Sequence, residues 1–439
     1  MATRKGAHDE VKTLRLPVMK NKLVYLASIG AGLEYYDFVV CGLLAGYLAK
    51  AFFPQTDPMV ASLQAFGLFS LGYFTRPLGG IIFGHLGDRY GRRAVFLWSM
   101  ILMAIATLSM GLLPTHFQLG GLATLGLILL RALQGIAFGA ELPGVMTFLM
   151  EHGSAKTRSF HGGVMLAGVS AGALLASGLL FFLAHFFSDP LMQRWGWRLP
   201  FLVGGALAVV AYTIRTSLPE TPLFLQAQTT RLRWPVCHLM KQFPLRILMG
   251  VGVAMLSASL CMFQISLPVF LHQVYGFETS DVYLAITFSF MWAVLILPVV
   301  GRGVDRVGRA KLLMYLSILL AVSCFAIFTL LNNKNFISLL CFILLLQSFT
   351  CAAQCASLPL LAELFPTPVR LSGTAFCYNT VHLLASLLPI LLGQWISWFG
   401  NMQHFYLVFI GLSLIVFCSA VWAHFNVLHP NSSPSQFQP

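Results

Sequence analysis

Long continuous apolar runs alternate with short polar loops along this chain of 439 residues. Each run is about 20 residues long or longer, which is the length a helix needs to cross the hydrocarbon core of a bilayer. Strands of a membrane β-barrel would instead alternate polar and apolar residues. The pattern therefore predicts an all-α membrane protein with twelve spans, at residues 23–49, 59–83, 94–113, 118–150, 161–187, 197–216, 245–275, 281–300, 312–331, 336–362, 373–399 and 403–425.

The longest connection between spans divides the chain into two halves. It covers residues 217–244 and contains prolines and basic residues. We expect a first six-helix bundle at residues 23–216 and a second at 245–426, with a polar segment at 1–22 and a short tail at 427–439. The first apolar run is too long for the core of a signal peptide, so we expect it to remain as the first span.

Composition excludes a soluble protein, because only 9% of the residues are charged and 58% are hydrophobic. Soluble domains carry about 25% charged residues. The formal net charge of +13 does not indicate a nucleic-acid partner, since the basic residues gather in alternate loops. This bias predicts that both ends of the chain and the central loop lie in the cytoplasm. The nine cysteines form no CxxC pair and are expected to be small buried hydrophobes.

A short charged motif occurs once in each half. The first copy, at residues 84–93, has the sequence GHLGDRYGRR, and the second, at 301–310, has GRGVDRVGRA. The residues that recur 217 positions later are Gly84, Asp88, Arg89, Gly91 and Arg92, which return as Gly301, Asp305, Arg306, Gly308 and Arg309. An offset of about half the chain length indicates a duplicated chain with two parallel repeats.

A second repeated pair supports the duplication. Glu151 precedes Arg158 by seven positions, and Glu363 precedes Arg370 by the same interval, 212 positions later. We expect these charges to lie on the cytoplasmic side and the two motif loops to form a gating latch. The alternative is that the loops are solvated and that their arginines only set the topology.

The motif DRxGR between spans two and three, echoed between spans eight and nine, resembles the signature loop of the major facilitator superfamily. Further segments resemble its metabolite:proton symporter family, which includes proline/betaine, alpha-ketoglutarate, citrate and shikimate permeases. These segments are EYYDF at 34–38, FFP at 52–54, RPLGG at 76–80, RALQG at 131–135, GAE at 139–141, GWRLPF at 196–201 and ELFPT at 363–367. The chain departs from the family pattern at Tyr35, Ala140, Pro143, Gly303 and Val304.

Several charged residues fall inside the expected spans of the first half, where burial is costly unless the charge is paired or functional. Glu34 and Asp37 lie three positions apart on one face of span one, and Arg131 lies at a similar depth in span four. We expect Glu34 and Asp37 to be proton-linked carboxylates, with Arg131 as their counter-ion or as a substrate anchor. A static ion pair that only fixes helix packing is the alternative.

Other polar residues are candidates for contacts with a substrate or counter-ion. Arg76 lies in span two, and Gln134 and Glu141 continue the helical stripe that begins at Arg131. The remaining candidates are Tyr36 in the first half and Gln264, Gln354 and Asn379 in the second half. Hydrogen bonds between helices are the alternative role for each of them.

The sequence lacks the motifs of two other protein classes. It contains no GxxxxGK[ST] phosphate loop and no HExxH metal motif. We therefore expect a transporter that is not an enzyme and that uses no metal or cofactor. Its expected partners are a small metabolite, protons and the lipid bilayer.

The resemblance implies a bacterial inner-membrane protein that acts as a monomer. It also implies proton-coupled uptake of a carboxylate-bearing metabolite, such as an organic acid, proline or betaine, by alternating access. A proton-independent facilitator and a non-transporting receptor remain the alternative functions.

Overall fold

The computed structural model describes residues 21–53, 58–154, 156–221, 224–225, 234–400 and 402–428, and these residues form helices and short connections without a strand. The first half contains α1 (Asn21–Leu43), α2 (Ala45–Phe52), α3 (Pro58–Tyr90), α4 (Arg92–Leu112), α5 (His116–Leu119), α6 (Gly121–Phe138), α7 (Glu141–His152), α8 (Arg158–Phe186), α9 (Asp189–Arg194), η1 (Gly196–Arg198) and α10 (Leu199–Thr216). The second half contains α12 (Pro235–Gln242), α13 (Pro244–Tyr275), α14 (Thr279–Val307), α15 (Arg309–Thr329), η3 (Leu330–Asn333), α16 (Phe336–Glu363), η4 (Thr367–Val369), α17 (Arg370–Ala385), α18 (Leu388–Phe399), η5 (Gln403–Phe405), α19 (Tyr406–Ala423) and η6 (His424–Leu428).

Twelve spans are confirmed. Eleven helical segments of the described chain are long and apolar enough to cross a membrane. The long helix α3 occupies the position of the remaining expected span. Residues 1–20 of the expected N-terminal segment, 222–223 and 226–233 of the central loop, and 429–439 of the tail lie outside the described residues.

Three of the expected spans are divided into two helices. Span one divides at Leu44, span four at Gly139 and Ala140, and span eleven at Ser386 and Leu387. In span four, Pro143 has no N–H to donate to the carbonyl of Gly139, four residues earlier. The break therefore leaves a polar carbonyl group at membrane depth, and a group elsewhere in the protein must satisfy it.

Small residues let α1 and α8 pack closely inside the first bundle. A Cβ added at Gly172 would overlap the backbone oxygen of Gly32, and one added at Gly168 would overlap the oxygen of Ser28. Close contact through small residues four positions apart is typical of helix packing in membranes.

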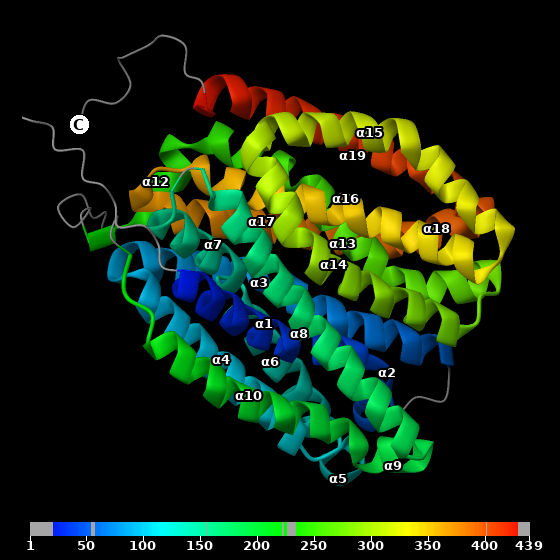
Figure 1. Cartoon of the computed structure of the whole chain (residues 1–439). Coiled ribbons are helices and arrows are strands. Elements are labelled where there is room, and N and C mark those ends of the chain that lie inside the picture. The colour runs from blue at the N-terminus through cyan, green and yellow to red at the C-terminus, as the bar shows by residue number, and fades with distance from the viewer. Residues whose placement is uncertain are drawn as a thin grey trace, which may run out of the picture.

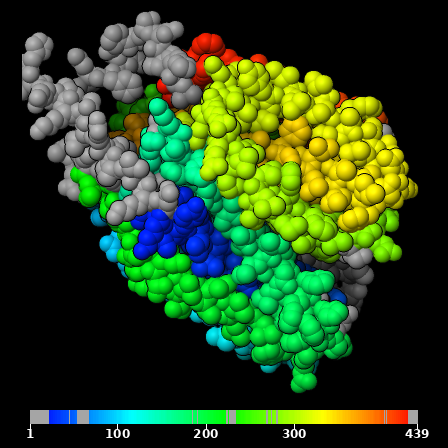
Figure 2. Space-filling view, in the orientation of Figure 1, coloured from blue at the N-terminus to red at the C-terminus, as the bar shows by residue number. Residues whose placement is uncertain are grey.

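Two long seams join the bundles. α8 of the first bundle lies along α14 of the second, and α3 lies along α17 (Figure 1). The space-filling view shows the green surface of α8 directly against the yellow-green surface of the second bundle (Figure 2). We call the end of the molecule that carries residues 84–93 and 301–310 the motif face.

Candidate functional site

The first motif copy is fastened to the second bundle at the motif face. Asp88 accepts hydrogen bonds from the backbone N–H groups of Leu371 (3.2 Å) and Ser372 (2.8 Å), which open α17. A carboxylate at a helix N-terminus satisfies unpaired N–H groups and complements the helix dipole. Burial raises the pKa of the Asp88 carboxyl to about 6, although the neighbouring Arg92 guanidinium and these amides lower it.

Arg92 is fully buried and joins Asp88 to a second carboxylate. Its guanidinium lies 3.2 Å from Asp88 and 2.9 Å from Glu151. Arg370 from the second bundle reaches the same oxygen of Glu151 at 3.3 Å, and Thr221 donates a hydrogen bond to its other oxygen. The carboxylate of Glu151 is therefore held by both halves of the chain.

The second motif copy makes the same contacts with the halves exchanged. Asp305 accepts hydrogen bonds from the N–H groups of Ser159 (2.9 Å) and Phe160 (2.8 Å), at the start of α8. Arg309 lies 2.7 Å from Glu363, and Arg158 of the first bundle lies 2.9 Å from the same oxygen. The repeated pairs thus bond crosswise: Glu151 binds Arg370, and Glu363 binds Arg158.

The other motif residues have local roles in this conformation. Gly91 and Gly308 adopt φ angles of 111° and 97°, which favour glycine, and each immediately precedes a helix. A Cβ added at Gly84 would press against the backbone of Ser372, so the absence of a side chain there allows α3 and α17 to approach. Arg89 lies over the ring of Tyr90 at 5.1 Å.

A cluster of three charges lies within the first bundle. Arg215 of α10 pairs with Glu34 of α1 at 3.3 Å and also with Glu141 of α7, and all three residues are buried. One guanidinium thus faces two carboxylates, and Oε2 of Glu141 has no hydrogen-bond partner among the described groups. Two ionised carboxylates would leave one buried negative charge uncompensated in this cluster, which is energetically costly.

Asp37 lies one helical turn from Glu34 and is also buried. Its Oδ1 has no hydrogen-bond partner in the described structure, and a Cβ added at Gly204 of α10 would overlap it. Within the described chain Asp37 pairs with no basic side chain. A carboxylate in this setting is a suitable proton acceptor, because binding a proton removes an unpaired buried charge.

Arg131 is not the partner of these carboxylates, which corrects the expected pairing. Its guanidinium donates to Gln134 at 3.0 Å and to the carbonyl oxygen of Phe38 at 3.2 Å. Weaker contacts of 3.4 Å reach the carbonyls of Leu68 and Phe69. In this conformation Arg131 therefore ties span four to spans one and two, and Arg215 is the counter-ion of Glu34.

Arg76 lies at the meeting point of the two bundles. Its guanidinium carbon is within 4.9–5.6 Å of four aromatic ring centres, those of Phe38, Tyr73 and Phe138 in the first bundle and Tyr378 in the second. Arg76 is only 2% exposed, and its Nη2 has no hydrogen-bond partner among the described groups. A buried guanidinium with an unused donor is suited to bind a carboxylate.

Asn379 connects this arginine to the break in span four. Its Oδ1 accepts a hydrogen bond from Nε of Arg76 at 3.2 Å, and its amide nitrogen donates to the carbonyl of Gly139. This carbonyl is the group that Pro143 leaves without a partner. Asn379 therefore makes an interhelical contact in this conformation.

The hydrogen bonds that the other candidate side chains make in the described structure involve neither Arg76 nor Arg215. Tyr36 donates to the carbonyl of Pro200, and Gln264 donates to Thr350 within the second bundle. Gln134 also donates to Thr107 within the first bundle. Gln354 is partly buried on α16. Among the described residues, no group of three or more His, Cys, Asp or Glu side chains is placed to hold a metal ion.

Two charged residues of these networks, Arg215 and Glu220, were not predicted from the sequence. Arg215 lies near the end of a span, where basic residues commonly only mark the membrane boundary. Glu220 accepts hydrogen bonds from the backbone N–H groups of Arg92 and Arg93 at the start of α4. The sequence does signal Glu220 as one of only 14 acidic residues, but it does not show which helix the residue caps.

Comparisons with known proteins agree with this architecture. A family model described as the Major Facilitator Superfamily matches residues 27–344 and 247–439. The inner membrane metabolite transport protein YhjE of Escherichia coli (strain K12) is 30% identical over 396 residues, which cover 86% of this chain and 88% of that protein. The glycine betaine/proline/ectoine/pipecolic acid transporter OusA of Dickeya dadantii (strain 3937) is 30% identical over 387 residues, covering 84% and 76%.

The fold is also similar to that of a solved structure. The proton:xylose symporter XylE, bound to 6-bromo-6-deoxy-D-glucose, superposes with a TM-score of 0.76 at 17% identity. The match covers 92% of this chain and 94% of that chain. At this identity the likeness concerns the fold and not the substrate.

Proposed function

Since this chain belongs to the major facilitator superfamily, we propose that it takes up a small carboxylate-bearing metabolite together with protons by alternating access. Its membership makes it a membrane transporter and not an enzyme. The substrate, the proton coupling and the roles of individual residues are the content of the proposal. We place the protein in a bacterial inner membrane with the motif face in the cytoplasm, as its basic loops favour.

Arg76 is the observation that carries the substrate class. It is a buried cation with a free donor, and residues of both bundles surround it. Alternating access places the substrate between the bundles near mid-membrane. The compounds named for the relative OusA, such as proline and glycine betaine, all carry a carboxylate. We assign Arg76 as the anchor of that carboxylate and the rings around it as the wall of the site.

Two features support proton coupling. One is the cluster of Glu34, Glu141 and Arg215, and the other is the buried Asp37. Two carboxylates share one arginine, and Asp37 has no cationic partner among the described residues. A conformational change that moves α1 or α10 alters the charge balance of these groups, and so changes their affinity for protons. We assign Asp37 and Glu34 as the residues that carry the proton, with Glu141 and Arg215 controlling its release.

The two motif networks favour a gating role at the motif face. Asp88 and Asp305 each bind the N-terminus of a helix in the opposite bundle, so the bundles cannot separate there unless these bonds break. With the motif face in the cytoplasm, this conformation is closed toward the cytoplasm. Opening inward then requires the free energy of substrate and proton binding to offset the loss of these contacts.

A competition experiment tests the substrate class directly. Binding of labelled proline and of labelled organic acids to the purified protein would be measured against analogues that lack the carboxylate, such as prolinamide and choline. The carboxylates should bind and the analogues should not. Arg76→Gln should weaken binding by about 10- to 100-fold, the usual cost of losing a charged hydrogen-bond donor. Arg194→Gln, at an exposed site in α9, is the matched control and should bind normally.

The outcomes distinguish the alternatives. Carboxylate and amide analogues that bind equally, or normal binding by Arg76→Gln, would contradict the assignment of Arg76. Saturable binding without any uptake into liposomes would indicate a receptor. Uptake that equilibrates without concentrating the substrate would indicate a facilitator.

A further inference from the structure

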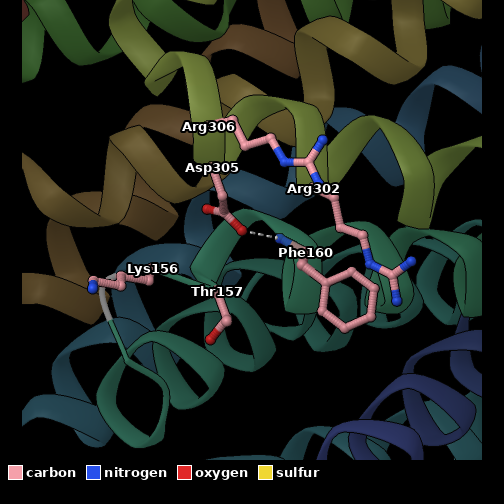
Figure 3. A pocket seen from close by; sticks show the side chains of 6 residues that line it. All are labelled: Lys156, Thr157, Phe160, Arg302, Asp305 and Arg306. Atoms are coloured by element: carbon pink, nitrogen blue, oxygen red, sulfur yellow. Dashed lines mark hydrogen bonds between the residues drawn. The ribbon is translucent and has the colours of Figure 1, made fainter.

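A cavity of about 610 Å³ opens on the motif face, at the seam between the two bundles. Lys156, Thr157 and Phe160 line it from the first bundle, and Arg302, Asp305 and Arg306 line it from α14 of the second (Figure 3). The cavity is distinct from Arg76 and from the Glu34–Arg215 cluster. In this conformation, the hydrogen bonds and ion pairs described above for the motif copies and the buried clusters involve none of its three cations.

The charge of the cavity is positive. Its one acidic residue, Asp305, accepts hydrogen bonds from the N–H groups of Ser159 and Phe160 and forms an ion pair with Arg309. Arg302 lies over the ring of Phe160 at 4.5 Å, and no carboxylate of the described chain pairs with it or with Arg306. The cavity is therefore complementary to an anion.

The internal repeat provides a comparison within the same molecule. In the first motif copy, His85 and Arg89 occupy the positions that correspond to Arg302 and Arg306. Pro368 corresponds to Lys156, because it follows Glu363 by the same five positions as Lys156 follows Glu151. There, α12 contacts α3, α17 and η4. Trp234 precedes that helix and lies with its ring 5.7 Å from His85, while Leu239 on it is fully buried.

The two copies thus differ in what covers them. The chain's own helix covers the seam in the first copy. The same place in the second copy is an open cavity with two additional cationic positions. This difference indicates that the second place accommodates a ligand from outside the described chain.

The membrane-facing side of α14 indicates what kind of anion fits. Leu295 and Val299 are 64% and 65% exposed and lie on the same helix face as Arg302 and Arg306. An apolar groove of about 150 Å³ continues this face; it is lined by Phe288, Met291, Trp292, Leu295, Leu340 and Leu344. Arg302 lies ten positions after Trp292, so about 15 Å of helix separates them, which is half of the hydrocarbon thickness. This is the length available to an acyl chain in one leaflet.

We propose that the cavity binds the phosphate headgroup of an anionic phospholipid whose acyl chain lies along the exposed face of α14. Basic pockets between transmembrane helices on the cytoplasmic side suit such headgroups. Arginine guanidinium groups hold phosphate oxygens in a bidentate geometry. Because the lining comes from both bundles, the site is complete only while they are together at the motif face. The bound lipid therefore favours this conformation.

The test is native mass spectrometry of the purified full chain titrated with phosphatidylglycerol and, separately, with phosphatidylcholine. The wild type should retain phosphatidylglycerol preferentially. Each basic side chain near anionic lipid contributes about fivefold to binding, so Arg302→Gln/Arg306→Gln should lower the affinity about 25-fold. Lys22→Gln/Lys241→Gln removes the same charge from exposed positions elsewhere on this side and should bind as the wild type does.

Two further arms make the result specific. Arg302→Lys/Arg306→Lys keeps the charge and should retain most of the binding, whereas a fold defect would affect both double variants. Excess inorganic phosphate should leave the lipid bound, and displacement by phosphate would instead assign the cavity to a soluble anion. Equal retention of phosphatidylglycerol by the wild type and the glutamine variant would overturn the proposal.

Discussion

The side chains of Arg76 and Asn379, 303 positions apart, are joined by a hydrogen bond of 3.2 Å that crosses from the first bundle to the second. The amide nitrogen of the same asparagine bonds the carbonyl of Gly139, which the helix break at Pro143 leaves free. A single side chain of α17 therefore holds both α3 and the break between α6 and α7. Both bonds must part when the bundles separate at this level.

Replacing Asn379 with alanine should loosen the contact between the bundles. The change leaves the Gly139 carbonyl and Nε of Arg76 without partners, at a cost of about 1–3 kcal/mol each. Hydrogen–deuterium exchange should become faster in α7 and α17. Gln264→Ala removes a side-chain bond that stays inside the second bundle, and it should leave exchange at the seam unchanged. Equal effects of both variants would contradict an inter-bundle role for Asn379.

Asp88→Asn should weaken the bonds to the N-terminus of α17, and Asp305→Asn should weaken those to the N-terminus of α8. Asparagine keeps the size of aspartate but loses the charge that favours a helix N-terminus by about 0.3–1 kcal/mol or more. Asp88→Asn should speed amide exchange at Leu371 and Ser372, and Asp305→Asn should speed it at Ser159 and Phe160. Exchange that increases at both sites in either variant would indicate a general loss of structure instead of two separate latches.

Arg215→Gln should destabilise the protein strongly, because it leaves Glu34 and Glu141 buried without a counter-ion. Breaking a buried pair in this way costs about 3–5 kcal/mol. The second substitution in Arg215→Gln/Glu141→Gln removes one of the stranded charges and should recover part of the lost thermal stability. If the double variant unfolds at a lower temperature than Arg215→Gln alone, the pairing inferred for this cluster is incorrect.

Two glycines of α8 should respond in opposite ways to replacement by alanine. Gly172→Ala places a methyl group against the backbone oxygen of Gly32 and should cost about 1–3 kcal/mol or more, because the backbones must move apart. Gly178 has open space around it, so Gly178→Ala should be neutral or stabilise the helix by about 0.5–1 kcal/mol. Thermal unfolding in detergent measures both. Similar losses from both variants would argue against close packing of α1 on α8.

The twelve spans and the two-bundle organisation were predictable because apolar run length and an internal repeat are properties of the sequence itself. The repeat also brought Asp88 and Asp305 to notice. The sequence did not show that each binds a helix start in the opposite bundle, since that depends on how the bundles dock.

The partner of Glu34 could not be predicted for a related reason. Arg131 lies within one apolar run and Arg215 near the end of another, so the sequence offers both as counter-ions of Glu34. Only the packing of α10 on α1 brings Arg215 to this carboxylate. The cavity at Arg302 could not be predicted from the internal repeat either, because α12 of the central loop covers the corresponding place in the first copy. The break in span four was not predicted, since residues 118–150 were expected to form one continuous helix and Pro143 was noted only as a departure from the family pattern. The role of Asn379 in satisfying the Gly139 carbonyl depends on how the bundles pack and could not be predicted either.

Proton-coupled accumulation is most directly tested by uptake into proteoliposomes with an imposed pH gradient, comparing the wild type with Asp37→Asn. The labelled substrate would be the carboxylate found to bind in competition. The wild type should concentrate it, and an uncoupler should abolish the accumulation. Asp37→Asn should fail to concentrate the substrate yet still exchange it across the membrane. Accumulation by Asp37→Asn equal to that of the wild type, or wild-type uptake that ignores the pH gradient, would contradict proton symport through this carboxylate.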